Sequence, residues 1–178
     1  RETDVQVIAD RMGVGKGTVY RYFPTKQELF FAAVDRGMRQ LQDRLQQRAY
    51  VVEDPVARIE VAIREYLAFF DEHPEFIELL MLERAEFKQR EQHTYFRYKD
   101  ESLKYWQSTI EELIRAGRVR PVPATRILEV VSDLLYGAIF TNLFSGRKQT
   151  FDEQARDILD IVFHGILEQG EKTDKEMA

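Results

Sequence analysis

The residues best suited to chemistry in this sequence lie close to its amino terminus. Lys16, Thr18, Tyr20 and Arg21 fall within six residues, with Gly17 among them. Lysine, arginine, threonine and tyrosine side chains donate hydrogen bonds to phosphates and base edges, and a glycine lets a backbone approach closely. This short segment therefore predicts a face that recognises nucleic acid.

Two short helices are expected to position that face. The first runs from about Asp4 to Met12, with Thr3 as its cap. Gly13 and Gly15 break it, and a second helix covers 16–22 and stops before Pro24. Val5, Ile8, Ala9 and Met12 should share one face of the first helix. One apolar set should pack the two helices across each other, comprising Val5, Ile8, Ala9, Val14, Val19 and Phe23. This spacing fits a helix-turn-helix, but it also fits an ordinary helical hairpin with a solvated polar face.

A longer stretch of residues distinguishes these alternatives. The run VGKGTVYRYFPTKQELF at 14–30, together with TDVQVIA at 3–9, resembles the signature of the TetR/AcrR family of transcription regulators. The resemblance implies an all-α fold, with a helix-turn-helix followed by a helical ligand-binding and dimerisation domain. It covers about 30 residues closely, whereas the rest of the chain is similar only in its plan of helices.

The resemblance also implies roles for particular residues. The implied DNA-binding positions are Thr3, Gln6, Lys16, Gly17, Thr18, Tyr20, Arg21, Tyr22 and Lys26. Two positions depart from the family pattern, because Gly15 stands where serine is usual and Tyr22 where histidine is common. Members of the family have a complete helix before the position of Thr3, so that helix is expected to be missing from this chain.

Charge is distributed unevenly along the 178 residues, whose formal net charge is -5. Residues 1–26 hold five basic and three acidic side chains, a net charge of +2, and the remainder carries -7. An acidic chain with a basic end would hold DNA by that end only. Cysteine is absent. The sequence shows no signal peptide and no apolar run near the roughly 20 residues of a membrane span. The expected location is the cytoplasm, with no membrane partner.

The remaining segments predict further helices. A long helix should cover 26–47, and another should begin at Asp54-Pro55 and end at His73-Pro74. Residues 75–116 should form two helices with a break within 87–94, because one helix would be about 60 Å long. A helix should end near Gly146, and the capping box Thr150 to Glu153 should open the last one. The expected domains are 1–47 for DNA binding, 48–170 for ligand binding and dimerisation, and 171–178 as a flexible tail.

The last two long helices are the most apolar part of the chain. A helix that is apolar on nearly all sides is buried on more than one side. We predict a two-fold dimer interface there, formed by Val131, Leu135, Ile139, Ile158 and Val162. A central helix pair in a monomer would give the same pattern.

Aromatic residues concentrate in the middle of the chain and suggest a pocket for an apolar or aromatic small-molecule effector. The predicted pocket residues are Tyr66, Phe70, Trp106 and Tyr136, on helices that surround the ligand cavity in similar proteins. Glu83 and Arg84 are candidate polar anchors, although a solvated helix face explains them equally well. Each aromatic residue could also simply fill the core.

Other functional classes find little support in the sequence. His73, His93 and His164 lack the spacing of metal ligands, and no phosphate-binding loop or set of catalytic groups can be assembled. We therefore expect no metal, no cofactor and no enzymatic activity. The favoured function is a homodimeric repressor that an effector releases from a palindromic operator in double-stranded DNA. Activation instead of repression stays open, and the alternative is a helical small-molecule-binding or protein-interaction module without DNA binding.

Overall fold

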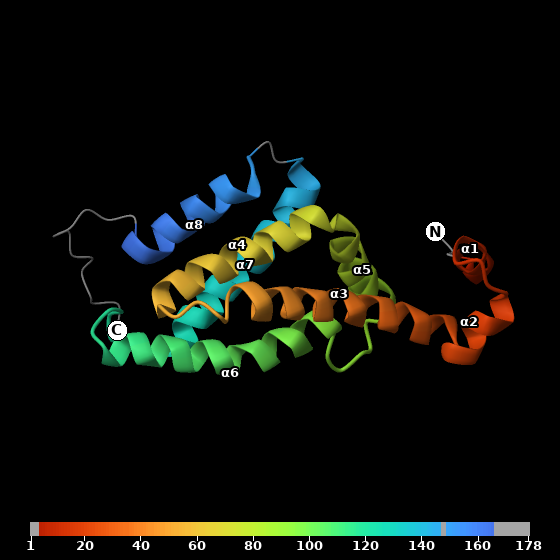
Figure 1. Cartoon of the computed structure of the whole chain (residues 1–178), viewed down its shortest axis with the longest axis horizontal. Coiled ribbons are helices and arrows are strands. Elements are labelled where there is room, and N and C mark those ends of the chain that lie inside the picture. Colours follow the sequence, from red (N-terminus) through yellow and green to blue (C-terminus); the bar gives the residue numbers. More distant parts are fainter. Residues whose placement is uncertain (1–3, 147–148, 166–178) are drawn as a thin grey trace.

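The computed structural model describes residues 4–146 and 149–165, and every regular element within these ranges is an α-helix. The helices are α1 Val5–Arg11, α2 Lys16–Tyr22, α3 Lys26–Arg48, α4 Pro55–Glu72, α5 Pro74–Glu86, α6 Thr94–Arg115, α7 Ala124–Ser145 and α8 Phe151–His164. Figure 1 shows that α1 and α2, the head, lie at one end of the long helix α3. The other helices form the body, in which α4, α5 and α6 pack against α3 and α8 packs against α4. The predicted all-α class and order of helices are confirmed.

Most helix ends follow from local capping chemistry. Asp54 accepts a hydrogen bond from the Ala57 N–H at 2.9 Å, with Pro55 in the first turn of α4. Thr150 and Glu153 form the complete capping box that opens α8. The expected cap of the first helix is corrected: Asp4 Oδ1 accepts from the Gln6 N–H at 2.8 Å. Thr3 lies outside the described residues, as does the tail predicted at 171–178.

One hydrophobic core holds the body together. Helix α4 is central, because it packs against α3, α5, α7 and α8. Leu67 and Phe70 of α4 belong to one core cluster with Val34 of α3 and Ile139 of α7, and all four side chains are at most 2% exposed. The head has a separate small core, so α3 is the element that joins the two regions.

Helix α7 differs from the other helices in its hydropathy. Its mean hydropathy reaches 1.5 over an 18-residue window, so by length and composition it could cross a membrane. This corrects the expectation that no apolar run approaches that length. The core helix of a soluble protein can pass the same test, so length and composition alone do not assign α7 to a membrane. Only 6% of that window is fully buried, although several of its side chains are partly buried against the core.

Candidate functional site

The head is built around three buried side chains. Val5 and Ala9 of α1 meet Val19 of α2, and Ala9 is fully enclosed. Gly13 turns the chain between the two helices with a φ of +66°, a conformation that costs glycine little. This crossing of two short helices was predicted. Met12, which was expected on the apolar face of the first helix, is instead 66% exposed.

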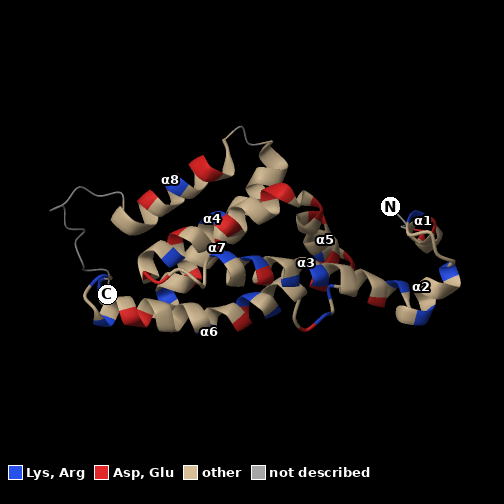
Figure 2. Ribbon diagram, viewed as in Figure 1, with Lys and Arg blue, Asp and Glu red and all other residues tan. Residues whose placement is uncertain are grey.

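The polar face predicted on α2 is open to solvent. Lys16, Gly17, Tyr20 and Arg21 are exposed, and Thr18 is half-buried. A Cβ added at Gly17 would meet nothing within 4 Å, so another backbone could approach there. Figure 2 shows basic positions on both helices of the head. The structure thus groups these side chains at the tip of the molecule, where a DNA duplex could reach them.

The other predicted DNA-binding residues flank this face. Tyr22 is exposed, and the Arg21 guanidinium lies 5.3 Å from its ring centre. Lys26 is exposed at the start of α3. Gln6 is exposed on α1, where its amide donates to Asp10 at 2.7 Å. Lys16 lies 3.7 Å from Asp4, a solvated ion pair that contributes little stability and could readily exchange for a phosphate.

Two groups of ion pairs tie α3 to the body. Asp35 of α3 accepts hydrogen bonds from Arg97 at 2.6 Å and Tyr98 at 2.8 Å, both on α6. Burial raises the pKa of Asp35, but hydrogen bonds from Arg39, Tyr98 and Arg97 outweigh it and lower the pKa overall. Position 35 therefore links the helix that carries the head to α6.

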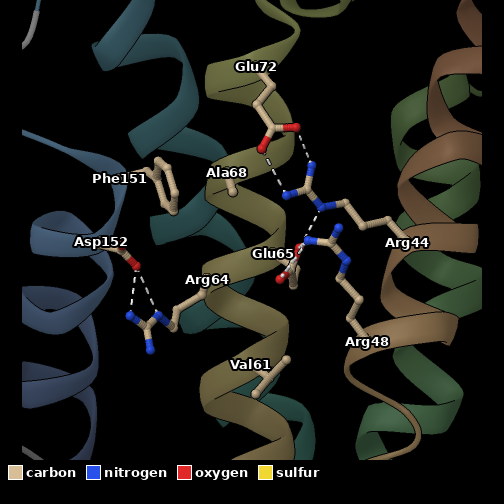
Figure 3. Close-up of a pocket in the computed structure, with 9 residues that line it drawn as sticks. All are labelled: Arg44, Arg48, Val61, Arg64, Glu65, Ala68, Glu72, Phe151 and Asp152. Carbon is tan, nitrogen blue, oxygen red and sulfur yellow. Dashed lines mark hydrogen bonds and ion pairs between the residues drawn. The ribbon is translucent and has the colours of Figure 1, made fainter.

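The second group lies between α3, α4 and α8 in a groove of about 350 Å³ (Figure 3). Arg44 donates to Glu72 at 2.6 Å and to Glu65 at 2.5 Å, and the Glu72 pKa is lowered by this hydrogen bond. Arg48 donates to Glu65 at 3.1 Å, while Arg64 and Asp152 are 2.7 Å apart across α4 and α8. The three arginines and three carboxylates of this groove neutralise one another.

Glu83 has a structural role that the sequence did not reveal. Its side chain is fully buried, so neither a solvated face nor an accessible polar anchor describes it. It pairs with Arg90 and accepts from the Thr94 N–H at 3.0 Å and the Thr94 hydroxyl at 2.8 Å. The Arg90 guanidinium in turn lies 4.2 Å from the ring centre of Phe31 on α3. Through Arg90, these contacts connect the turn between α5 and α6 to α3.

The predicted pocket residues separate into two places. Phe70 is 2% exposed, and its ring lies 5.1 Å from that of Tyr66. The Tyr66 hydroxyl lies 2.9 Å from the Tyr95 hydroxyl, and the Tyr95 ring is 4.8 Å from Tyr136. These side chains form one aromatic cluster, which connects α4, α6 and α7.

Trp106 lies elsewhere, against Tyr50 at 5.5 Å and Tyr105 at 5.1 Å between ring centres. Tyr136 borders a second groove of about 650 Å³, formed by α5 and α7, which Arg84 also lines. Lys88 and Leu80 line this groove too, and sequence reasoning missed both. The sequence did offer one indication of this groove, because Arg84 and Lys88 are two basic residues four positions apart.

The residues of the predicted dimer interface differ in how far the fold of the single chain covers them. Ile139 is 1% exposed and belongs to the core of its own chain, so it cannot face a second copy. Val131, Leu135 and Ile158 also pack partly against that core, and Val162 is half-buried. The uncovered apolar side chains on α7 are instead Val130, Leu134 and Phe144, which are 63%, 39% and 69% exposed.

Taken together, the two-helix head, the long connecting helix and the helical body define a helix-turn-helix DNA-binding protein. Residues 1–33 match the family model described as bacterial regulatory proteins, tetR family. The HTH-type transcriptional regulator YhgD of Bacillus subtilis (strain 168) is 28% identical over 150 residues, 79% of this chain and 73% of the relative. These matches support a TetR family transcriptional regulator, as the signature in the head predicted.

Solved structures share the fold over most of the chain. The TetR family regulator PfmR from Thermus thermophilus has a TM-score of 0.75 at 18% identity, covering 93% of this chain and 90% of that one. FadR from Bacillus subtilis, in complex with stearoyl-CoA, has a TM-score of 0.72 at 15% identity, covering 93% and 89%. At these identities the likeness concerns the fold.

Proposed function

We propose that this regulator acts in the cytoplasm as a homodimeric repressor that binds a palindromic operator and releases it when a small molecule binds the body. The observation that carries the proposal is the exposed set of Lys16, Gly17, Tyr20 and Arg21 at the tip of the head. These residues combine phosphate-binding cations with a position where the backbone can approach DNA. With Thr18 and Lys26, they form the proposed DNA-binding face.

Dimerisation would proceed through one side of α7. Val130, Leu134 and Phe144 recur at spacings of four and ten residues, with Gly137 and Thr141 between them, so all five positions follow one line along the helix. Ile139 lies on the opposite side, inside its own core. Ile161 of α8, 48% exposed, adds apolar surface. A second copy would cover this surface, and a two-fold axis would set two heads about 34–36 Å apart, or a multiple of that, along DNA.

An effector would act through α3, which carries the head. The body holds α3 through Asp35 and Arg97, through Arg44 and Glu65, and through the contact of Arg90 with Phe31. A molecule that favours one arrangement of α5, α6 and α7 would change these ties and thus the spacing of the two heads. Only a difference in affinity between the two arrangements can produce that shift. The stearoyl-CoA bound to the FadR neighbour supports an effector with an apolar acyl chain.

Gel shifts with the regulator's own promoter region, at several salt concentrations, test the proposal. Lys16→Ala should weaken binding to many sequences and lower the slope of log K against log salt by about 1, as loss of one phosphate contact does. Tyr20→Ala should also weaken binding. Arg115→Ala is the matched control, because it also removes an exposed positive charge, but from the far end of α6.

The result that would overturn the proposal is specific. If the wild-type protein shows no salt-sensitive binding preference for any promoter segment, or if Lys16→Ala and Arg115→Ala bind alike, the head does not read DNA as described. Sedimentation of the same samples would report the dimer directly.

A further inference from the structure

The groove between α5 and α7 has the form of a binding site. Its volume of about 650 Å³ is within the usual range for small-molecule sites, roughly 300–1,000 Å³. Leu80, Met81, Tyr136 and Phe140 supply apolar walls, and Arg84 and Lys88 supply two positive charges. An apolar slot beside two cations fits a molecule with a hydrocarbon part and a negatively charged part.

The two cations differ from most arginines of the body. Within the described residues, neither Arg84 nor Lys88 has a carboxylate within 4.0 Å, and both are exposed. In the groove beside α8, by contrast, Arg44, Arg48 and Arg64 all face carboxylates (Figure 3). An anion would have to displace those partners there, whereas it would meet uncompensated charge between α5 and α7.

The apolar side of the groove leads into the aromatic cluster. The Tyr136 ring lies 4.6 Å from Phe140 and 4.8 Å from the buried Tyr95, and Leu80 is 7% exposed. Burial raises the pKa of the Tyr136 hydroxyl although nearby Arg84 lowers it, which puts that cation close to the aromatic wall. A hydrocarbon chain would therefore find apolar surface directly beside the positive charge.

We propose that the α5–α7 groove binds an anionic amphiphile, whose acid group pairs with Arg84 and Lys88 and whose hydrocarbon chain packs on Leu80, Tyr136 and Phe140. The proposal rests on the proposed function in taking this ligand as the effector. A free fatty acid and an acyl thioester of coenzyme A share this chemistry, with a carboxylate or phosphates as the anion. Arg84 follows the buried Glu83, so a ligand held there adjoins the tie between α5 and α6.

Calorimetric titration of the full chain tests the site without DNA. The probes are decanoate, decanoyl-CoA and uncharged 1-decanol. We expect binding of at least one anionic probe, with an affinity that Arg84→Gln and Lys88→Gln each lower about fivefold, the effect of an ion pair near 1 kcal/mol. Decanoate and decanoyl-CoA are distinguished by which of them loses affinity in these variants.

Two further variants keep the result interpretable. Arg64→Gln is the matched control, because it removes a paired arginine from the other groove and should leave every affinity unchanged. Ala85→Trp places a large side chain on the exposed lining of the α5–α7 groove and should abolish binding of all three probes. Circular dichroism would confirm that each variant folds.

The proposal is overturned if both anions bind the Gln variants as tightly as the wild type, if 1-decanol binds as tightly as the anions, or if no probe binds at all. Gel shifts on the same samples separate this failure from failure of the proposed function. A protein that binds its operator but none of the probes refutes only the groove.

Discussion

The contact between α3 and α5 decides whether a substitution at Gly37 raises or lowers the stability of the protein. Gly37, in the middle of α3, is buried beneath Phe76 of α5. A Cβ built on Gly37 would lie 2.6 Å from Phe76 Cε1 and 2.8 Å from Cγ, and closer still to Cδ1. The ring cannot easily retreat, because it stacks on Phe69 at 5.7 Å and lies 5.6 Å from the His73 ring. Gly37→Ala therefore forces α3 and α5 apart or displaces this stack.

The expected magnitude follows from two opposing effects. In an unobstructed helix, alanine is more stable than glycine by about 0.5–1 kcal/mol. Overpacking a well-filled interior costs about 1–3 kcal/mol. The second effect is larger, so Gly37→Ala should lower the free energy of unfolding by about 1 kcal/mol and Tm by about 2–4 °C.

Thermal unfolding at one fixed protein concentration measures this change in Tm, since the proposed dimerisation would make Tm depend on concentration. Phe76→Leu in the Gly37→Ala background should recover part of the loss, which a double-mutant cycle detects as a favourable coupling. Gly17→Ala is the matched control, because its Cβ meets nothing within 4 Å. If Gly37→Ala raises Tm as Gly17→Ala is expected to, α3 and α5 do not cross as described.

Three further predictions concern the buried Glu83, the ion pairs of Asp35 and the exposed apolar side of α7. Glu83→Ala leaves Arg90 and the Thr94 N–H without their buried partner and should cost about 2–3 kcal/mol in urea unfolding; an unchanged midpoint would contradict this. The pKa of Asp35 is lower in the folded protein than its value near 3.9 in the unfolded chain, so the ionised carboxylate stabilises the fold at pH values above about 3.9. This stabilisation is lost as the pH falls through the pKa of Asp35 in the folded protein. Asp35→Asn should therefore destabilise the protein at pH 7 and flatten the loss of stability below about pH 4, and parallel acid limbs for the two proteins would refute the role. Leu134→Glu should yield monomers in sedimentation, whereas an intact dimer would place the interface elsewhere.

The helices could be predicted because their signals are local. Asp54-Pro55 and the Thr150 capping box each mark a helix start within four residues of chain. The head could be predicted for the same reason, since Gly13 and the face from Lys16 to Arg21 lie within one short segment. Its first cap was misassigned to Thr3 because Asp4, the actual cap, has equally good capping chemistry.

The body was less predictable because its side chains interact with residues that are distant in the sequence. Helix α7 is apolar on nearly every side, so periodicity could not tell that Ile139 faces the core and Val130 faces outward. In the sequence, Glu83 cannot be distinguished from a surface glutamate. Only the folded chain brings the Thr94 N–H, eleven residues later, within hydrogen-bond distance of it. Likewise, Arg84 differs from Arg64 only in lacking a nearby carboxylate, which depends on how distant helices pack.

By itself, then, the sequence determined the all-α class, the order of the helices and the DNA-reading segment, because propensity, capping and a contiguous signature act within a few residues. Tertiary structure alone decided which side of α7 is left uncovered, which carboxylate is buried and which cations stay unpaired. Burial and ion pairing are properties of the packed arrangement, since a side chain loses water or gains a partner only when another element arrives.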